Sequence, residues 1–248
     1  GHLACDVDGI GKLPDEDVLV QAITDRLLAP EKKQDLSGCH ILVTAGPTRE
    51  SIDPVRYLTN HSSGKMGYAI AKVCSMRGAD VTLVSGKTAI KSPLFVDVVP
   101  VTTARDMYEA VTSLSADMDI IIKAAAVADY RPENVSDEKI KKQDGNMAIP
   151  LTRTKDILAY LGERKKDGQF ICGFSMETEH MVENSKKKLE KKHIDMVAAN
   201  NLKVAGAGFG VDTNIMTLIT KEGEKELPLM SKEDVANAIL DEIVAKIN

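Results

Sequence analysis

The chain has 248 residues, of which 43% are apolar and 28% charged, as is usual for a globular protein of one large or two small domains. Lysine and arginine number 32 against 37 acidic residues, and the resulting net charge of −5 disfavours nucleic-acid binding. Trp is absent and no apolar run reaches the roughly 20 residues that cross a bilayer. We therefore expect neither a nucleic-acid nor a membrane partner.

Residues 1–38 are expected to form a peripheral tail. They begin GHLACDVDG, without the basic region and apolar core of a signal peptide. The four cysteines are scattered and form no CxxC pair, so a reducing, cytoplasmic location is expected. Residues 15–28 predict an amphipathic helix and residues 30–38 a linker. The expected buried stripe of the helix is Val18, Ile23, Leu27 and Leu28.

The body, residues 39–248, is expected to form one domain because strand and helix patterns alternate along it. Strands are predicted at 40–44, 80–84 and 119–123, and helices at 65–77 and 104–115. This β-α-β-β-α-β order at short spacing predicts the α/β class. We expect a Rossmann-like, open, mostly parallel sheet with helices on both faces.

A charged stretch from residue 130 to 150 then interrupts the alternation, with a turn signal at Asp144, Gly145 and Asn146. Residues 139–142 and 147–151 are predicted to pair around this turn as a two-stranded flap that carries lysines. Regular patterns resume after it. Helices are predicted at 156–164, 178–192 and 232–247, and strands at 169–174, 195–199 and 214–220.

The loop at residues 44–67 is the most informative segment. It follows a predicted strand, and the carboxyl ends of strands are where an open α/β sheet binds its ligand. Arg49 and Arg56 can hold a phosphate or carboxylate by paired N–H donation. Asn60 offers a donor and an acceptor that can orient a reacting oxygen.

The end of this loop, Ser62, Ser63 and Gly64, precedes a predicted helix. Its hydroxyls and free backbone N–H groups suit an anion. The simpler alternative is that Asn60 and Ser62 merely cap the helix. Capping alone is the usual explanation of an isolated Ser-Ser-Gly, and the length and polarity of the whole loop weaken that explanation here.

A second candidate is the run from Ala124 to Asp129, which follows a predicted strand. Small residues such as Ala124 and Ala125 let a flat ligand approach the backbone closely. Asp129 can accept a hydrogen bond from an exocyclic amine or bind a metal. The alternative is tight strand–helix packing, with Asp129 serving as a cap.

Two lysine groups complete the candidates. In a strand, Lys139 and Lys141 share one face and Lys142 faces away, so a mobile strand can close over a triphosphate. For the lysine cluster taken by itself, a solubilising edge strand protected by lysines is the favoured interpretation. Lys188 and Lys192, four residues apart, share one helix face, and a solvated helix explains them equally well.

Two familiar patterns are discounted. Tyr68 and Lys72 have the spacing of a short-chain dehydrogenase pair but lie too early, and the Gly46 loop lacks GxGxxG. A nicotinamide- or flavin-dependent oxidoreductase is therefore a weaker alternative. A noncatalytic nucleotide-binding assembly module is a second alternative. The five histidines show no metal-ligand spacing.

Together these segments resemble the phosphopantothenoylcysteine synthetase family, the ligase half of a bifunctional bacterial coenzyme A biosynthesis protein. The resemblance covers roughly residues 35–248. Each motif alone is weak, but their combination and order are specific. The motifs are TRESIDPVRYLTNHSSGKMG at 48–67, AAAVADYRP at 124–132, KIKK at 139–142, KDI at 155–157 and GFSMET at 173–178.

The resemblance implies a ligase that joins 4′-phosphopantothenate to cysteine. In the implied reaction the substrate carboxylate attacks the α-phosphorus of CTP, giving an acyl-cytidylate and pyrophosphate. The amine of cysteine then displaces CMP and forms the amide. CTP is thus a substrate, Mg²⁺ is expected to assist at the triphosphate, and no flavin is expected on this chain.

By resemblance, Asn60 acts on the acyl-cytidylate and Lys139 closes over the phosphates. The implied nucleotide-binding residues are Lys123, Ala124, Ala125, Asp129, Lys139, Thr154, Lys155, Asp156, Ile157, Phe174, Lys188 and Lys192. The candidates for the substrate phosphate and pantothenate are Arg49, Arg56, Asn60, Ser62, Ser63 and Gly64. Lys123 stands where the family commonly has a small residue.

Residues 1–14 resemble the end of a partner flavoprotein, phosphopantothenoylcysteine decarboxylase, with Cys5 in the place of its catalytic cysteine. The match is partial because Asp6 replaces the usual glycine. It implies that residues 1–38 are a remnant of a fused decarboxylase plus a linker. The family also implies a homodimer, for which residues 197–199 and 215–219 are the expected interface.

Overall fold

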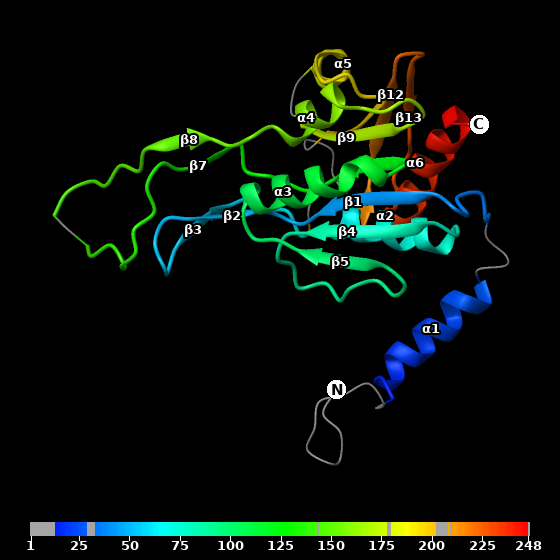
Figure 1. Cartoon of the computed structure of the whole chain (residues 1–248), viewed down its shortest axis with the longest axis horizontal. Coiled ribbons are helices and arrows are strands. Elements are labelled where there is room, and N and C mark those ends of the chain that lie inside the picture. The colour runs from blue at the N-terminus through cyan, green and yellow to red at the C-terminus, as the bar shows by residue number, and fades with distance from the viewer. Residues whose placement is uncertain are drawn as a thin grey trace.

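A computed structural model describes residues 13–28, 33–142, 144–177, 180–201, 208 and 210–247. Its centre is an eight-stranded sheet (Figure 1). Across the sheet the strands are β13 (Glu224–Glu226), β12 (Met216–Thr220), β10 (Met196–Asn201), β9 (Phe170–Glu177), β6 (Ile120–Lys123), β1 (His40–Ala45), β4 (Asp80–Ser85) and β5 (Asp97–Pro100). Among the described strands of this sheet, β12 pairs antiparallel with both β10 and β13, and the other pairs are parallel. The predicted fold class is confirmed.

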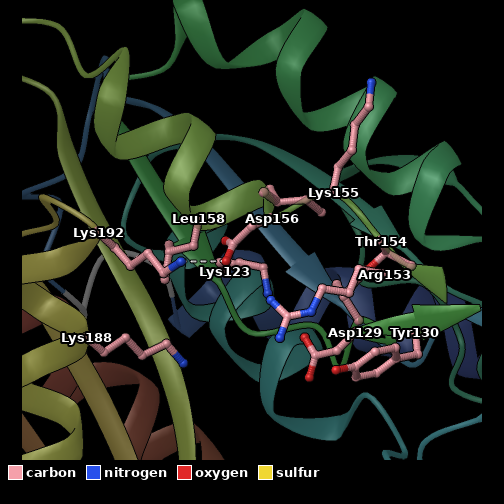
Figure 2. A pocket seen from close by; sticks show the side chains of 12 residues that line it. Lys123, Asp129, Tyr130, Arg153, Thr154, Lys155, Asp156, Leu158, Lys188 and Lys192 are labelled. Carbon is pink, nitrogen blue, oxygen red and sulfur yellow. Dashed lines mark hydrogen bonds and ion pairs between the residues drawn. The ribbon is translucent and has the colours of Figure 1, made fainter.

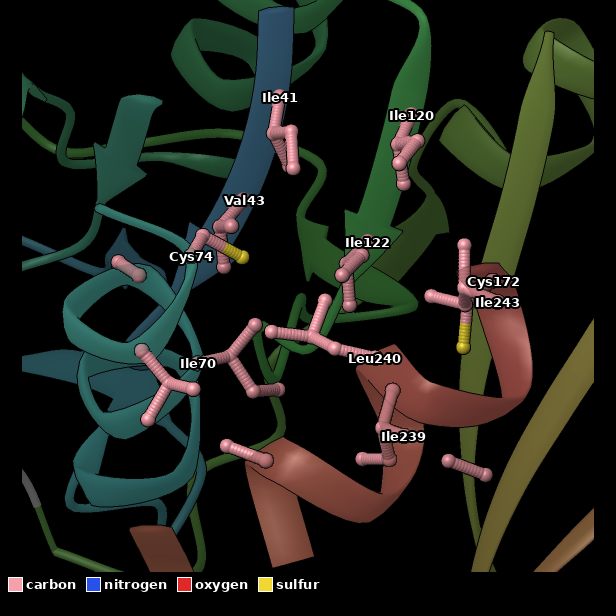
Figure 3. Close-up of a cluster of buried hydrophobic side chains, with 14 of the residues drawn as sticks. Ile41, Val43, Ile70, Cys74, Ile120, Ile122, Cys172, Ile239, Leu240 and Ile243 are labelled. Carbon is pink, nitrogen blue, oxygen red and sulfur yellow. The ribbon is translucent and has the colours of Figure 1, made fainter. Parts of the chain in front are cut away.

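Helices cover both faces of the sheet. The helices α2 (Lys65–Met76) and α6 (Lys232–Ile247) lie on one face, and α3 (Ala104–Leu114), α4 (Ile157–Glu163) and α5 (Met181–Lys191) on the other. A short 3₁₀ turn (Ser115–Asp117) follows α3. The central strands are apolar on both faces because both are covered. Figure 3 shows the core under α2 and α6.

The order in which strands are added to the sheet reverses between the parallel neighbours β1 and β6. The strands β4 and β5 lie on one side of β1, and β6, β9 and β10 on the other. The loops that leave β1 and β6 are joined, since the Thr48 N–H donates to the Ala126 carbonyl at 3.2 Å and the Ala126 N–H donates to the Gly46 carbonyl at 3.0 Å. An open α/β sheet binds its ligands at such a switch point, so this edge positions the candidate site.

The start of α2 bears on the capping alternative. Gly64 is the N-cap residue, with a φ of 83° and no side chain to cap the helix, and the Ser62 Oγ accepts from the Gly64 N–H at 3.3 Å, just before the helix begins. One turn on, a Cβ added at Gly67 would lie 2.6 Å from the Ala45 Cβ. The absence of a side chain at Gly67 therefore lets α2 pack directly on β1.

The predicted flap is only partly right. Its paired strands are β7 (Tyr130–Pro132) and β8 (Leu151–Arg153), and residues 139–142 and 147–150 are irregular. The alternating side chains of the KIKK motif therefore do not lie on a strand. Figure 1 shows this flap projecting from the body beside a second hairpin. That hairpin pairs β2 (Arg49–Ser51) with β3 (Tyr57–Thr59), and a further small sheet pairs β11 (Thr213–Asn214) with β14 (Met230–Ser231).

Two expectations about apolar surfaces are wrong. The helix α1 (Glu16–Leu28) lies away from the body in Figure 1, and its Ile23 and Leu27 are 59% and 71% exposed. Conversely, Val197 and Ile219 are fully buried in the chain's own core, so they are not available to a second subunit. Among the described residues, no helix is long and apolar enough to cross a membrane.

Candidate functional site

A basic pocket of about 370 Å³ opens where β6, the base of the flap, the start of α4 and the end of α5 meet (Figure 2). Eight of the predicted nucleotide-binding residues line it: Lys123, Asp129, Thr154, Lys155, Asp156, Ile157, Lys188 and Lys192. Its lining includes five basic side chains and two carboxylates. The basic residues are Lys123, Arg153, Lys155, Lys188 and Lys192, and the acidic residues are Asp129 and Asp156. The excess of positive charge suits a polyanionic ligand.

The two lysines of α5 are held by protein acceptors. Lys192 pairs with Asp156, with 2.5 Å between Nζ and Oδ2, and Lys188 Nζ donates to the Phe174 carbonyl at 2.7 Å. Asp156 also caps α4 by accepting from the Ala159 N–H at 2.9 Å. Burial acts to raise the pKa of the Asp156 carboxyl, but the hydrogen bonds from Lys192 and Ala159 outweigh it and hold that pKa below its usual value.

The turn between β8 and α4 forms the opposite wall. Thr154 donates from Oγ1 to the Ala128 carbonyl at 2.7 Å, and its N–H donates to the Asp129 carbonyl at 3.0 Å. Lys155 lies over the Tyr108 ring, with Nζ 4.6 Å from the ring centroid. The two hydrogen bonds of Thr154 tie the turn to the loop that follows β6 and so fix Asp129 relative to the turn.

Sequence reasoning missed four residues of this pocket. They are Val127, Tyr130, Arg153 and Leu158. Tyr130 lies inside the AAAVADYRP motif, and Arg153 directly precedes Thr154, so proximity to those motifs was an available signal. The pairing of β7 with β8 brings the two together, with the Arg153 Cζ 5.9 Å from the Tyr130 ring centroid.

A second cavity, of about 140 Å³, lies on the other side of the Ala124–Ala126 backbone. The predicted residues that line it are Ser62, Ser63, Gly64, Ala124, Ala125 and Phe174. The Phe174 side chain lines this cavity, while its carbonyl binds Lys188 of the basic pocket. Phe174 therefore connects the second cavity to Lys188 of the basic pocket.

The second cavity also contains polar residues that the sequence reasoning missed. Asn200 is 3% exposed, and its Oδ1 has no hydrogen-bond partner in the described part of the chain. Lys232, the first residue of α6, is 6% exposed and donates to the carbonyls of Val211 and Thr213. Both lie far along the chain from the Ser62 loop, and no local pattern marks either residue.

Four predicted residues lie outside both cavities. Asn60 joins the site through its Nδ2, which donates to the Ala126 carbonyl at 3.1 Å. Arg56 pairs with Asp53 and donates to the Ile140 carbonyl at 3.0 Å, so it anchors the flap. The Arg49 Cζ lies 4.8 Å from the Tyr57 ring centroid. Lys139 is exposed, next to the anchored Ile140.

A magnesium ion fits this site only together with a nucleotide. In the described residues, no group of three or more His, Cys, Asp or Glu side chains is arranged to hold a metal. Mg²⁺ bound with a nucleotide keeps water and phosphate oxygens as ligands and needs few protein oxygens. The donor set of the described residues is thus compatible with a metal that arrives with phosphates.

These features define an open, doubly wound α/β domain with a basic pocket at its topological switch point. The chain belongs to the family described as "DNA/pantothenate metabolism flavoprotein C-terminal domain", which matches residues 36–247. It is 49% identical over 247 residues to the coenzyme A biosynthesis bifunctional protein CoaBC of Bacillus subtilis and 44% identical over 245 residues to that of Vibrio vulnificus. The alignments cover 99% and 98% of this chain but only 60% of each relative.

A solved structure agrees with this assignment. The C-terminal domain of a coenzyme A biosynthesis bifunctional protein CoaBC superposes with a TM-score of 0.74 at 47% identity. The superposition covers 98% of that domain and 87% of this chain. The family predicted from the motifs is confirmed.

Proposed function

We propose that the chain is the ligase part of a coenzyme A biosynthesis protein and joins 4′-phosphopantothenate to cysteine at the expense of CTP. One observation carries the proposal: the predicted nucleotide-binding residues Asp129, Thr154, Asp156, Lys188 and Lys192 line one basic pocket. Its relatives are named as coenzyme A biosynthesis proteins, which supports the same pathway.

In the first step, the basic pocket holds the nucleotide. Asp129 accepts from the base, and Lys188 and Lys192 neutralise the phosphates, so that the substrate carboxylate can attack the α-phosphorus and pyrophosphate can leave. Mg²⁺ bound to the phosphates supplies further charge neutralisation there. Phe174 lies between this pocket and the second cavity, where we place the substrate next to Ser62, Ser63 and Gly64.

In the second step, Asn60 orients the acyl carbonyl of the cytidylate for attack by the cysteine amine. Its amide already donates to the carbonyl of Ala126, a residue that lines the second cavity. The bond to CMP breaks as the amide bond forms, and the amine loses its proton to solvent. Arg56 supports this step indirectly because it fixes the flap through Ile140.

We also propose how the chain relates to the longer protein. It spans about 60% of the length of the curated relatives it matches. Residues 1–38 are proposed to belong to a fused decarboxylase and its linker, and residues 39–248 to the ligase domain. We further propose a cytoplasmic homodimer. Cys5 lies outside the described residues.

Ligand-dependent melting curves test the class of protein. CTP is expected to raise the melting temperature, whereas NAD, NADP and FMN should leave it unchanged, because binding to the native state stabilises it by mass action. Stabilisation by a dinucleotide and not by CTP would favour the oxidoreductase alternative. Stabilisation by CTP without cysteine-dependent CMP release would favour the noncatalytic assembly module.

Lys139→Gln tests the flap. Lys139 adjoins Ile140, whose N–H donates to Asp53 Oδ2 at 3.2 Å, so the flap is anchored beside the lysine. If Lys139 closes over the phosphates, its loss should slow pyrophosphate release by about 10²-fold, as for one preorganised donor. The matched control is Lys141→Gln in the same flap. Near-normal release in Lys139→Gln would remove the residue from the mechanism.

A further inference from the structure

Lys123 differs from the other cations of the basic pocket. Lys192 pairs with Asp156, Lys188 donates to a carbonyl, and Lys155 lies over an aromatic ring. Within the described part of the chain, Lys123 has no assigned hydrogen bond or ion pair, although it lines the same pocket (Figure 2). A half-buried ammonium group without an acceptor is costly in the empty protein, and an anionic ligand relieves that cost.

The backbone explains why Lys123 is desolvated. It is the last residue of β6, and its neighbour in register on β9 is Gly173. A Cβ built on Gly173 would lie 2.9 Å from Leu158 and 3.1 Å from Ile194, so those side chains fill the space where a neighbouring side chain would stand. Lys123 thus lines the pocket beside apolar side chains.

Charged groups from several segments line the pocket with Lys123. They are Asp129 from the loop after β6, Arg153 from β8, Lys155 and Asp156 from the turn before α4, and Lys188 and Lys192 from the end of α5. Loss of solvation lowers the pKa of Lys123 to about 8, Lys188 adds to the effect, and Asp156 and Asp129 oppose it. A substantial fraction of the empty protein therefore carries a neutral amine at mildly alkaline pH.

We propose that the Lys123 side chain is a direct ligand of a nucleotide phosphate and takes up a proton when the polyphosphate binds. The proposal rests on the proposed function for the identity of the nucleotide, but its chemistry requires only a polyphosphate. A phosphate next to Lys123 replaces the missing acceptor and favours the ammonium form. Affinity must then fall as pH rises through the range in which the empty protein loses this proton.

The test is calorimetric titration of the 248-residue chain with CTP and, separately, with inorganic tripolyphosphate between pH 7 and 9. Two buffers of different ionisation enthalpy report proton uptake. For a group of pKa about 8, binding should take up about half a proton at pH 8 and weaken about 10-fold from pH 7 to pH 9.

Three variants decide the outcome. Lys123→Met should bind more weakly at pH 7 and show no proton uptake. Lys123→Arg keeps its charge throughout this range and should retain affinity at pH 9. The matched control is Lys191→Met, an exposed lysine of α5 that does not line the pocket and should behave as wild type.

The result also separates this inference from the proposed function. If CTP binds and Lys123→Met keeps the wild-type pH dependence and proton uptake, the inference is overturned and the function stands. If tripolyphosphate shows the Lys123-dependent slope but CTP does not bind, the inference stands and the assignment of CTP fails. If neither ligand binds, the inference is overturned as well.

Discussion

Asn60→Asp is expected to lower cysteine-dependent CMP release by about 10²- to 10³-fold while pyrophosphate release stays within a few-fold of wild type. The substitution keeps the shape of the side chain but removes the donor, and it places a carboxylate against the Ala126 carbonyl that Asn60 now binds at 3.1 Å. A carboxylate also repels the oxyanion that develops when the amine attacks. Separate assays of pyrophosphate and CMP measure the two half-reactions.

A matched control for this variant is Asn237→Asp. Asn237 on α6 also donates its Nδ2 to a backbone carbonyl at 3.1 Å, that of Glu233, but it does not line either cavity. It should leave both half-reactions unchanged. An equal loss of both half-reactions in Asn60→Asp would contradict the role in the second step and would assign Asn60 to nucleotide or substrate binding.

Gly162→Ala is expected to destabilise the protein by about 3 kcal/mol and to weaken nucleotide binding. A Cβ at Gly162 in α4 would lie 1.7 Å from the Lys192 carbonyl oxygen, which is backbone and cannot swing aside. An alanine in a helix ordinarily gains about 1 kcal/mol over glycine, but this clash outweighs that gain. Because Lys192 pairs with Asp156, moving its backbone also disturbs the basic pocket.

Denaturant unfolding and CTP titration measure both effects of Gly162→Ala. For a protein of this size, 3 kcal/mol corresponds to a fall in Tm of about 6–12 °C. Gly223→Ala is the control, since an added Cβ there meets no atom within 4 Å. If Gly162→Ala unfolds like wild type, the close approach of α4 to the end of α5 is incorrect.

Much of the fold could be predicted because the signals are local. The apolar runs at β1, β4 and β6 and the periodic pattern of α2 lie within short windows, and the structure has them within one or two residues. The flap was harder because its strand pairing joins Tyr130 to Arg153 across a long insertion. The lysines of the KIKK motif at 139–142 have strand-like spacing, but the strands that pair in the flap are residues 130–132 and 151–153.

More of the basic pocket than of the second cavity could be predicted, because several of its residues are marked by local sequence signals. Lys188 and Lys192 share a helix face by spacing alone, and Asp156 opens α4 as its N-cap. Asn200 and Lys232 reach the second cavity only through tertiary packing, so no local signal marks them. The expected interface strands failed because an apolar run does not distinguish a subunit contact from the chain's own core, in which Val197 is buried.

The central claim is that the chain activates phosphopantothenate with CTP and transfers the acyl group to cysteine. Pyrophosphate release with CTP or with ATP, in the presence and absence of phosphopantothenate and of cysteine, tests it most directly. We expect release that requires phosphopantothenate and prefers CTP, with CMP and the amide appearing when cysteine is added. No release with either nucleotide, or release that is independent of phosphopantothenate, would contradict the claim.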